Sequence, residues 1–364
     1  MSFSRDFSPH STPPHTSKYD RIRQYLADAG APAFRYRQVI QSIFRDRIGR
    51  FSQMSALPRS LRERLADQFS DQVVSLTRVA SQESEQAQKV LYDLPGGKRI
   101  EAVALKFLAG WESFCISSQS GCGFGCSFCA TGRLGLLRNM TADEITDQLL
   151  DFHLSGRTID SVSFMGMGEA LSNTHTFDAI RLMTRPDLFA LSPRRITVST
   201  IGIVPQMERL GRELPQVNLT LSLHSPFDEQ RTAMMPINRK YPIAELMQAL
   251  DRHVRVTGRK AYVAYVLIAG VNDSDDHALA LAQLVRARFR QGQLLHVSLI
   301  RYNEIAAAPA AFTRIDTSGA RRFCSILAQH AVKATIRASF GNDIDAACGQ
   351  LFASYRQPAD QRLP

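Results

Sequence analysis

The sequence predicts an α/β protein in which a parallel sheet, curved into a full or partial barrel with helices outside, follows a small N-terminal helical domain. Two observations predict this fold. Beyond about residue 141, segments of strand pattern, loop and helix pattern alternate, as in βαβ units. Residues 18–70 instead carry helical periodicity. A chain of 364 residues, 44% of them apolar, can form one large domain and a smaller accessory one.

The N-terminal part of the chain divides into a tail and a basic helical domain. Residues 1–17 are rich in Ser, Pro and His and poor in aliphatic side chains, so we expect a disordered tail. Residues 18–70 form the predicted accessory domain, with ten arginines against five acids between Asp20 and Asp67. With a net charge of +10 and a pI near 9.6, this domain is a candidate RNA contact. Solvated helix faces also carry such arginines.

An extended segment is predicted next, over residues 71–110, which joins the accessory domain to the large domain at 111–355. Residues 356–364 are expected to form a C-terminal tail. Thr141 and Glu144 form a capping-box pattern that opens a helix to about Leu154. The extended runs at the start are Val73–Val79, Lys89–Leu94, Arg99–Phe107 and Ser113–Ser118. The later strands are Ser161–Met165, Arg195–Ser199, Val217–Leu223, Lys260–Ile268, Leu294–Ile300 and Val332–Arg337, with helices between them such as Ile243–Val256 and His277–Phe289. The site of such a fold lies at the C-terminal ends of its strands.

Three closely spaced cysteines, Cys122, Cys126 and Cys129, are the most informative feature of the chain. Three thiolates can hold three corners of a cubic iron–sulfur cluster and leave the fourth iron open. A structural zinc site needs four Cys or His ligands, and beyond Cys115 the next histidine is His153. Disulfides need an oxidising compartment, whereas the sequence has no signal-peptide core and no apolar run that could span a membrane, so we expect a cytoplasmic protein. The spacing, with Phe128 before the last cysteine, resembles the signature of the radical S-adenosylmethionine (SAM) enzymes.

Further motifs follow in a fixed order and make the resemblance specific. They are Gly110 to Gln119, Met165-Gly166-Met167-Gly168-Glu169-Ala170-Leu171, Ser199 to Gly202, Ser222 to Pro226, Met235 to Asn238, Arg301-Tyr302-Asn303 and Asp343 to Leu351. Over about residues 18–355 they resemble the Cfr/RlmN family of ribosomal RNA adenine methyltransferases. Within that family, Ala170, Trp111-Glu112-Ser113 and Ser192 to Arg195 resemble the Cfr branch. Cfr methylates carbon 8 of adenosine 2503 in 23S RNA, and RlmN methylates carbon 2.

The resemblance implies a catalytic role for three side chains. Cys348 would take a methyl group from one SAM, and a second SAM would generate the radical that activates this methyl group for addition to the adenine. Cys115 would then release the product by forming a transient disulfide with Cys348, and Glu101 would accept the ring proton. From sequence alone both cysteines could be buried packing residues, and Glu101 lies in an alternating strand where an exposed carboxylate is ordinary. Cys324 matches no family motif and is expected in the core.

The resemblance also implies the cofactors and the residues that bind SAM. These residues are Gly168, Glu169, Ser199, Ser222, Leu223, His224 and Asn303. A Gly-x-Gly-Glu run alone could be a tight turn, and His224 could be a structural histidine. We expect one [4Fe-4S] cluster held by Cys122, Cys126 and Cys129, and two SAM molecules per turnover.

The substrate and partners follow from the same resemblance. An adenine must be unstacked before it can react, so we expect 23S RNA to bind before or during ribosome assembly. Candidate phosphate contacts outside the accessory domain are Arg133, Arg138 and Arg194-Arg195, although any of these could be solvated charge. A flavodoxin-type electron donor and a monomeric protein without membrane attachment are also expected. Carbon-2 methylation is one alternative, and an iron–sulfur RNA-binding or redox protein with a switchable Cys115–Cys348 disulfide is another.

Overall fold

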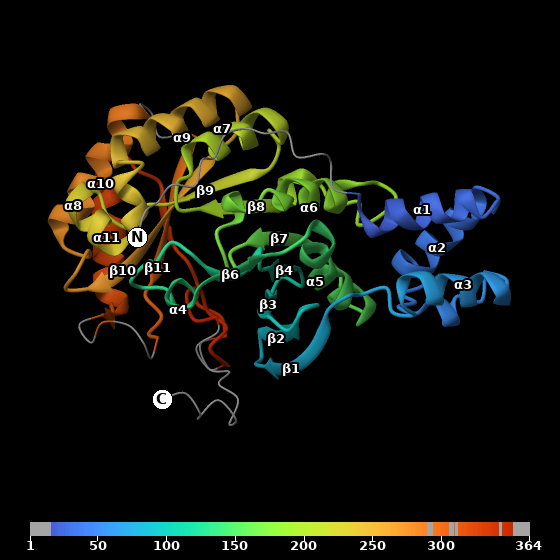
Figure 1. The fold of residues 1–364 in the computed structure, drawn as a ribbon. Coiled ribbons are helices and arrows are strands. Elements are labelled where there is room, and N and C mark those ends of the chain that lie inside the picture. Colours follow the sequence, from blue (N-terminus) through green and yellow to red (C-terminus); the bar gives the residue numbers. More distant parts are fainter. Residues whose placement is uncertain (1–15, 290–293, 306–308, 310–311, 342–343, 352–364) are drawn as a thin grey trace.

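The computed structural model describes residues 16–289, 294–305, 309, 312–341 and 344–351, and Figure 1 shows their arrangement. The N-terminal helices lie at one end, beside a large curved sheet that is covered on its outer side by helices. Most of the predicted tail at 1–17, and all of the predicted tail at 356–364, lies outside the described residues. Within the described part of the chain, no helix is both long and apolar enough to cross a membrane.

Three short helices form the N-terminal domain, where the sequence has helical periodicity. They are α1 (Lys18–Asp28), α2 (Phe34–Phe44) and α3 (Arg59–Phe69), with the 3-10 turn η1 (Phe51–Gln53) between the last two. Each has one apolar side, and in α1 this side buries Tyr19, Ile22 and Leu26. Ser17 does not belong to a tail as predicted. It is buried, and its side chain accepts the Asp20 N–H as the N-cap of α1, which satisfies an amide that has no partner within the helix.

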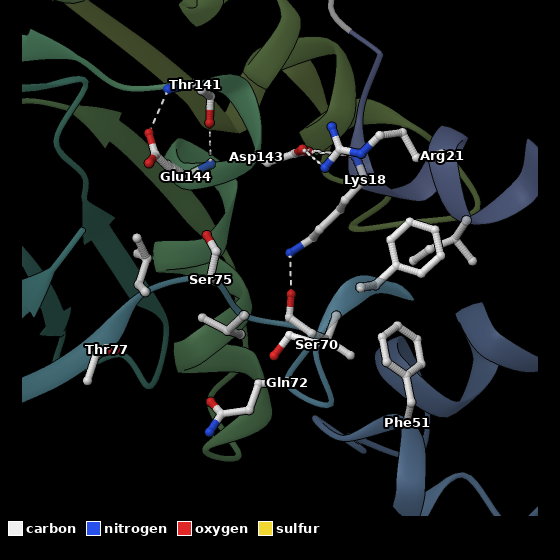
Figure 2. Close-up of a pocket in the computed structure, with 15 residues that line it drawn as sticks. Lys18, Arg21, Phe51, Ser70, Gln72, Ser75, Thr77, Thr141, Asp143 and Glu144 are labelled. Atoms are coloured by element: carbon white, nitrogen blue, oxygen red, sulfur yellow. Dashed lines mark hydrogen bonds and ion pairs between the residues drawn. The ribbon is translucent and has the colours of Figure 1, made fainter. Parts of the chain in front are cut away.

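The N-terminal domain is joined to the sheet domain by a buried polar network (Figure 2). The Lys18 backbone N–H donates to both carboxylate oxygens of Asp143, at 3.0 and 2.9 Å. The Lys18 ammonium pairs with the fully buried Asp147 and donates to the Val73 carbonyl oxygen at 2.8 Å. A cavity of about 560 Å³ lies beside this network, lined by residues of both domains that include Phe51. The two domains therefore meet through charge pairs as well as apolar contacts.

The described strands form one eleven-stranded sheet and one two-stranded sheet. In the large sheet the order is β1-β2-β3-β4-β7-β8-β9-β10-β11-β13, with β12 paired to β10. Pairing is antiparallel from β1 to β4 and parallel from β4 to β13. The path ends at β1 and β13 without closing, so the α/β prediction is confirmed in its partial-barrel form. The strands are β1 (Thr77–Glu83), β2 (Ala87–Asp93), β3 (Arg99–Lys106), β4 (Glu112–Cys115), β7 (Ser161–Phe164), β8 (Ile196–Thr200), β9 (Asn218–Ser222), β10 (Ala261–Ala269), β11 (Leu295–Arg301), β12 (Thr313–Arg314) and β13 (Ala334–Ile336).

Helices connect the parallel strands and cover the outer side of the sheet (Figure 1). The capping box that the sequence predicts at the start of α5 is present, with Thr141 and Glu144 each accepting the other's backbone N–H. The helices are α5 (Ala142–Leu154), α6 (His175–Thr184), α7 (Val204–Glu213), α8 (Asp228–Met234), α9 (Ile243–Thr257), α10 (Asp275–Arg288) and α11 (Thr317–Gln329), with 3-10 turns η2 (Ala170–Ser172), η3 (Pro193–Arg195) and η4 (Pro236–Arg239).

The second, small sheet was not expected from the sequence. It pairs β5 (Gln119–Cys122) with β6 (Gly135–Asn139), and the short helix α4 (Ala130–Arg133) lies between them. Gly121 makes this pairing possible, because its φ is +74° and a Cβ there would lie 2.0 Å from the Gly135 carbonyl oxygen. The hairpin holds the three closely spaced cysteines in one compact loop.

Most predicted strand bounds differ from the observed ones by about one or two residues, and the first and fourth extended runs differ by more. The run Val73–Val79 becomes strand only from Thr77, because Val73 and Leu76 are buried beside the N-terminal domain instead. The run Ser113–Ser118 ends as strand at Cys115, since the Ser118 N–H leaves the ladder and donates to the Met167 carbonyl oxygen. The last strand is shorter than predicted and covers only Ala334–Ile336.

Candidate active site

A cavity of about 170 Å³ opens at the C-terminal ends of the parallel strands. The chain segments that follow β7, β8 and β9 supply much of its wall. Nine of the residues proposed from sequence line this cavity: Cys122, Cys126, Cys129, Gly168, Glu169, Ser199, Ser222, His224 and Cys348. The structure thus brings together side chains that are more than 200 positions apart in the sequence.

The three closely spaced cysteines lie on one side of the cavity, and all three are free thiols. Cys122 ends β5 and Cys129 is the N-cap of α4. Burial raises the pKa of Cys122 to about 12, and the neighbouring Cys129 raises it further. Burial and the two neighbouring thiols likewise raise the pKa of Cys126 well above its usual range. Three neighbouring thiols, of which Cys126 is buried and the other two are partly buried, therefore resist ionisation unless a cation compensates their charge.

Glu169 lies after β7 and connects the strand-end loops to one another. Its carboxylate accepts the N–H of Ile201 at 2.9 Å and that of Leu171 at 3.2 Å. Burial raises the pKa of Glu169 to about 7, although these hydrogen bonds lower it. Glu169 therefore fixes the loop after β8 and also borders the cavity.

The glycines before Glu169 have a packing role that the sequence did not indicate. A Cβ at Gly166 would lie 2.6 Å from the Ile116 backbone, and one at Gly168 would lie 2.5 Å from the Gln119 Cβ. Gly168 also has a φ of +96°. Both glycines therefore allow the loop after β7 to pack against the segment that leads from β4 into β5. This contact places the cluster loop beside the strand ends.

His224 lines the cavity in an unusual backbone conformation, with a φ of +61°. Its Nδ1 accepts the Val266 N–H at 2.9 Å, so in the neutral ring the proton is on Nε2. Burial lowers the pKa of His224 to about 3, and nearby Arg231 lowers it further. His224 is therefore a neutral hydrogen-bond donor at neutral pH rather than a general base.

Leu223 and Asn303 are placed differently from the other proposed SAM contacts. Leu223 is fully buried and does not line the cavity, so it contributes to the loop through its backbone. Asn303 lines an adjoining cavity of about 190 Å³, and its side-chain amide donates to the Cys348 carbonyl oxygen at 3.1 Å. Asn303 thus holds the loop that carries Cys348.

The adjoining cavity contains the second pair of proposed catalytic cysteines. Cys115, at the end of β4, is buried, whereas Cys348 is exposed. Burial raises the pKa of Cys115 to about 11, the nearby Cys348 raises it further, and a hydrogen bond from the Ser163 hydroxyl at 3.2 Å opposes this. Ile300, Arg337 and Cys348 line both cavities. Cys348 is therefore at the boundary between the two spaces.

Glu101 is not the exposed strand carboxylate that the alternating pattern suggested. It lies on β3 with a fully buried side chain, 3.8 Å from the equally buried ammonium of Lys89 on β2. The Lys89 ammonium also donates to the Asp345 carbonyl oxygen at 3.3 Å, in the segment that leads to Cys348. Glu101 lines neither of the two cavities, so its connection to Cys348 runs through Lys89.

Comparison with known proteins agrees with this geometry. A model of the radical SAM superfamily matches residues 116–282, and a model of the ribosomal RNA large subunit methyltransferase N-terminal domain matches residues 17–70. The Bacillus velezensis protein named ribosomal RNA large subunit methyltransferase Cfr is 50% identical over 95% of this chain and 99% of its own length. The Staphylococcus aureus protein of the same name is 51% identical over 93% and 97%. The crystal structure of a radical SAM methyltransferase from Sphaerobacter thermophilus superposes with a TM-score of 0.86 and 40% identity, over 93% of this chain and 99% of its own.

The chain belongs to the Cfr/RlmN family of radical SAM methyltransferases.

Membership of the radical SAM superfamily implies a [4Fe-4S] cluster and SAM, and the residues present fit both groups. Cys122, Cys126 and Cys129 are mutually close free thiols beside a cavity. Among the described residues, no group of three or more His, Cys, Asp or Glu side chains could hold a metal ion. A cubic cluster does not require such a group, because each thiolate binds a different iron. The Cfr/RlmN site therefore has the donor set for a cluster with one open iron.

Sequence reasoning missed Arg231, whose side chain is fully buried in α8. Its guanidinium donates to the carbonyl oxygens of Leu223, Ile201 and Ser222 at 3.0, 2.8 and 3.1 Å, and to Asn238 Oδ1 at 2.7 Å. Burial lowers the pKa of Arg231 to about 10, while Cys126 raises it. Arg231 thus holds the loops after β8 and β9 in place through these hydrogen bonds. The only sequence signal is its position shortly before the Met235 to Asn238 motif.

Proposed function

We propose that this Cfr/RlmN family member methylates carbon 8 of adenosine 2503 in 23S ribosomal RNA, by way of a methyl group carried on Cys348. The position of Cys348 supports this proposal most directly, because the residue lines both the cavity of the cluster cysteines and the cavity of Cys115. A thiol in this place can exchange groups with a cofactor on one side and with a second thiol on the other.

The substrate explains why a carrier thiol is needed. Carbons 2 and 8 of adenine lie between nitrogens and are electron-poor, so neither can attack the methyl group of SAM as an amine would. When bound, the cluster and SAM supply radical chemistry that can remove a hydrogen atom from an unreactive methyl group. Cys348 would hold that methyl group at the boundary of the two cavities and present it to the adenine. The two roles of SAM imply two molecules per turnover.

Release of the product is assigned to Cys115. Once the adenine is linked to Cys348 through the new carbon, a thiolate at Cys115 attacks the Cys348 sulfur and forms a disulfide. Before this attack the adduct would lose its ring proton and one electron, which the bound cluster could accept. The bond between the Cys348 sulfur and the methylene carbon then breaks, its electron pair goes to that carbon, and the carbon takes up a proton to become the methyl group. Cys115 lines the same cavity as Cys348, and the nearby Cys348 raises the pKa of Cys115.

Glu101 is the proposed acceptor of the ring proton, as the family resemblance implies. The fully buried carboxylate of Glu101 lies 3.8 Å from the ammonium of Lys89. The hydrogen bond from Lys89 to Asp345 links this pair to the segment of Cys348. Glu101→Gln should therefore form the covalent RNA–protein adduct and fail to release it.

We propose carbon 8 rather than carbon 2 because of the similarity of this chain to proteins named Cfr. The relatives that match at about 50% identity over nearly the whole chain are named Cfr. Ala170 is buried at the start of η2, directly after Glu169. Methylation of carbon 8 at the peptidyl transferase centre would also protect ribosomes against antibiotics that bind there, which we propose as the physiological consequence. An increase in the inhibitory concentration of such antibiotics upon expression would test it.

The partners are proposed on the same basis. The RNA should bind before or during ribosome assembly, with an affinity that falls steeply with salt because arginines contact phosphates. A flavodoxin-type electron donor, a monomeric state and a cytoplasmic location remain predictions of the sequence.

The decisive test is mass spectrometry of nucleosides from 23S RNA that lacks prior methylation at this adenosine. The RNA is incubated with anaerobically reconstituted, reduced protein and SAM. We expect 8-methyladenosine with the native protein, none with Cys348→Ala, and a trapped adduct with Cys115→Ala. Formation of 2-methyladenosine alone would assign the chain to carbon 2. Absence of methylation with an intact cluster would favour a redox or RNA-binding role.

A further inference from the structure

The hairpin between β3 and β4 carries an aromatic stack that the proposed reaction does not use. The rings of Phe107 and Trp111 stack with centroids 3.8 Å apart and an interplanar angle of 4°. The Phe107 N–H donates to the Trp111 carbonyl oxygen at 3.0 Å, and the Gly110 N–H donates to the Phe107 carbonyl oxygen at 2.8 Å, which closes the turn. The Phe340 ring contacts Phe107 edge-on, with ring centroids 5.2 Å apart. The stack is therefore fixed by backbone and ring contacts.

Part of this stack faces solvent. Trp111 is 41% exposed although Phe107 covers one face of its indole, and Leu108 at the turn is 92% exposed. A turn closed by an aromatic pair needs neither an exposed indole nor an exposed leucine for its own stability. Together Trp111 and Leu108 form a small apolar surface on an ordered hairpin, and we call it the Trp111 platform. Such a surface suggests a binding partner with a flat apolar face.

The Trp111 platform lies beside the proposed reaction site. Phe107 and Phe340 line the cavity that contains Cys115 and Cys348. Phe107 pairs with Trp111 at the end of the β3–β4 ladder, where Leu105 is opposite Ser113 and Val103 is opposite Cys115. Side chains alternate along a strand, so Trp111 projects to the same side as Cys115, about 13 Å away along the chain. A nucleobase stacked on the platform would therefore be a neighbour of the nucleobase that reacts at Cys115, and not the same nucleobase.

Basic side chains border the same region. Arg314 donates to the Ser339 hydroxyl, next to Phe340, at 3.0 Å, and to Asn303 Oδ1 at 3.2 Å. Burial lowers the pKa of Arg314, and nearby Arg301 lowers it further, which indicates that the two cations are close. Arg337 lines both cavities, and Glu304 is the acid near Arg314. The region thus combines a flat aromatic surface with positive charge, which complements a polyanion that carries planar bases.

We propose that the Trp111 platform stacks a nucleobase of the single-stranded RNA that flanks the target adenosine. The inference rests on the proposed function and adds a positioning surface to it. Stacking on the indole would hold the neighbouring nucleotide away from the helix, so the target base remains unstacked and can enter the cavity of Cys115 and Cys348. Leu108 would contact the edge of the stacked base.

Trp111 is the only tryptophan in the 364-residue chain, so its fluorescence reports on this surface directly. The probe is a 23S RNA fragment that carries the target adenosine, added to the cluster-loaded protein. We expect quenching of the Trp111 emission upon binding. Trp111→Ala should weaken RNA affinity about 5- to 150-fold, the range for loss of one base–aromatic stack, and lower kcat/KM for methylation similarly. Trp111→Phe should retain most of both.

Two further measurements make the result decisive. Leu108→Ser changes a side chain that is 92% exposed, so it should fold normally and weaken RNA binding by a smaller factor. SAM cleavage without RNA should be unchanged in all variants, which separates this surface from the cofactor site. Unquenched emission upon RNA binding, or native affinity in both Trp111→Ala and Leu108→Ser, would overturn the inference. Weaker binding of the electron donor with unchanged RNA affinity would do so as well, and would assign the platform to a protein partner. Failure of the native protein to methylate RNA would instead refute the proposed function.

Discussion

Replacement of Arg231 by methionine tests whether one buried side chain holds the strand-end loops in place. Methionine fills a similar volume but donates no hydrogen bond, so it leaves four acceptors without their donor: the carbonyl oxygens of Leu223, Ile201 and Ser222, and Asn238 Oδ1. An unsatisfied buried acceptor costs about 1–3 kcal/mol. The sum of these four costs exceeds the expected change in the free energy of unfolding, because removal of the guanidinium also removes its own desolvation cost.

We therefore expect Arg231→Met to lower the free energy of unfolding by about 3–5 kcal/mol, which is less than the sum of four such costs. Ser222 at the end of β9 and His224 in the loop after it border the cavity, so SAM affinity should fall together with stability. Arg231→Lys keeps the charge but cannot reach all four acceptors at once, and should be intermediate.

The measurement is urea unfolding followed by circular dichroism, with SAM binding by equilibrium dialysis, for proteins reconstituted in the same way. Arg255→Met is the matched control, because the Arg255 side chain is 76% exposed and pairs with Asp251 one helical turn away. That control should change stability by less than about 0.5 kcal/mol. If Arg231→Met unfolds at the same urea concentration as Arg255→Met and binds SAM normally, the reasoning about Arg231 is wrong.

Three further perturbations follow from the structure. Gly121→Ala would place a Cβ 2.0 Å from the Gly135 carbonyl oxygen and should prevent iron incorporation. A Cβ at Gly125 meets nothing within 4 Å, so Gly125→Ala should retain most of the iron, and equal iron content in the two variants would contradict the steric argument. Lys18→Met breaks the ion pair with the fully buried Asp147 and should lower the free energy of unfolding by about 3–5 kcal/mol, with faster amide hydrogen exchange in α1. Unchanged exchange in α1 would show that this ion pair does not hold the N-terminal domain in place. Burial lowers the pKa of His253 to about 4, so the unfolded chain binds the extra proton first and stability should fall as pH decreases from about 6.5 to 4. His253→Leu should lose this part of the pH dependence of urea unfolding. A pH dependence identical to that of the native protein would show that His253 does not contribute to it.

Patterns of short range predicted much of the fold. The alternation of strand and helix indicated the parallel sheet, and the Thr141–Glu144 capping box marked the start of α5. The β5–β6 hairpin escaped prediction because its strands are short and its pairing depends on Gly121, where a Cβ would collide with the Gly135 carbonyl oxygen of the other strand. The late start of β1 has a tertiary cause, since Val73 and Leu76 are buried beside the N-terminal domain rather than in the ladder.

The site was predictable where residues are chemically distinctive and not where they act through the backbone. The cysteines could be found from spacing, whereas Arg231 could not, because its partners are mostly carbonyl oxygens of two distant loops and any residue type has one there. The burial of Glu101 was equally hidden. An alternating strand pattern marks one exposed face, but the face of β3 that carries Glu101 is covered, and the lysine that pairs with it lies on the neighbouring strand.

The two thiols of the adjoining cavity differ in a way that gives the proposed reaction an order. Cys348 is exposed and can exchange groups first, whereas burial and the charge of Cys348 both raise the pKa of Cys115. Once Cys348 carries a carbon substituent it can no longer be an anion, so its contribution to that shift disappears and Cys115 ionises more readily. In the proposed reaction, the thiol that attacks last is therefore the one whose ionisation becomes easier after the first has reacted.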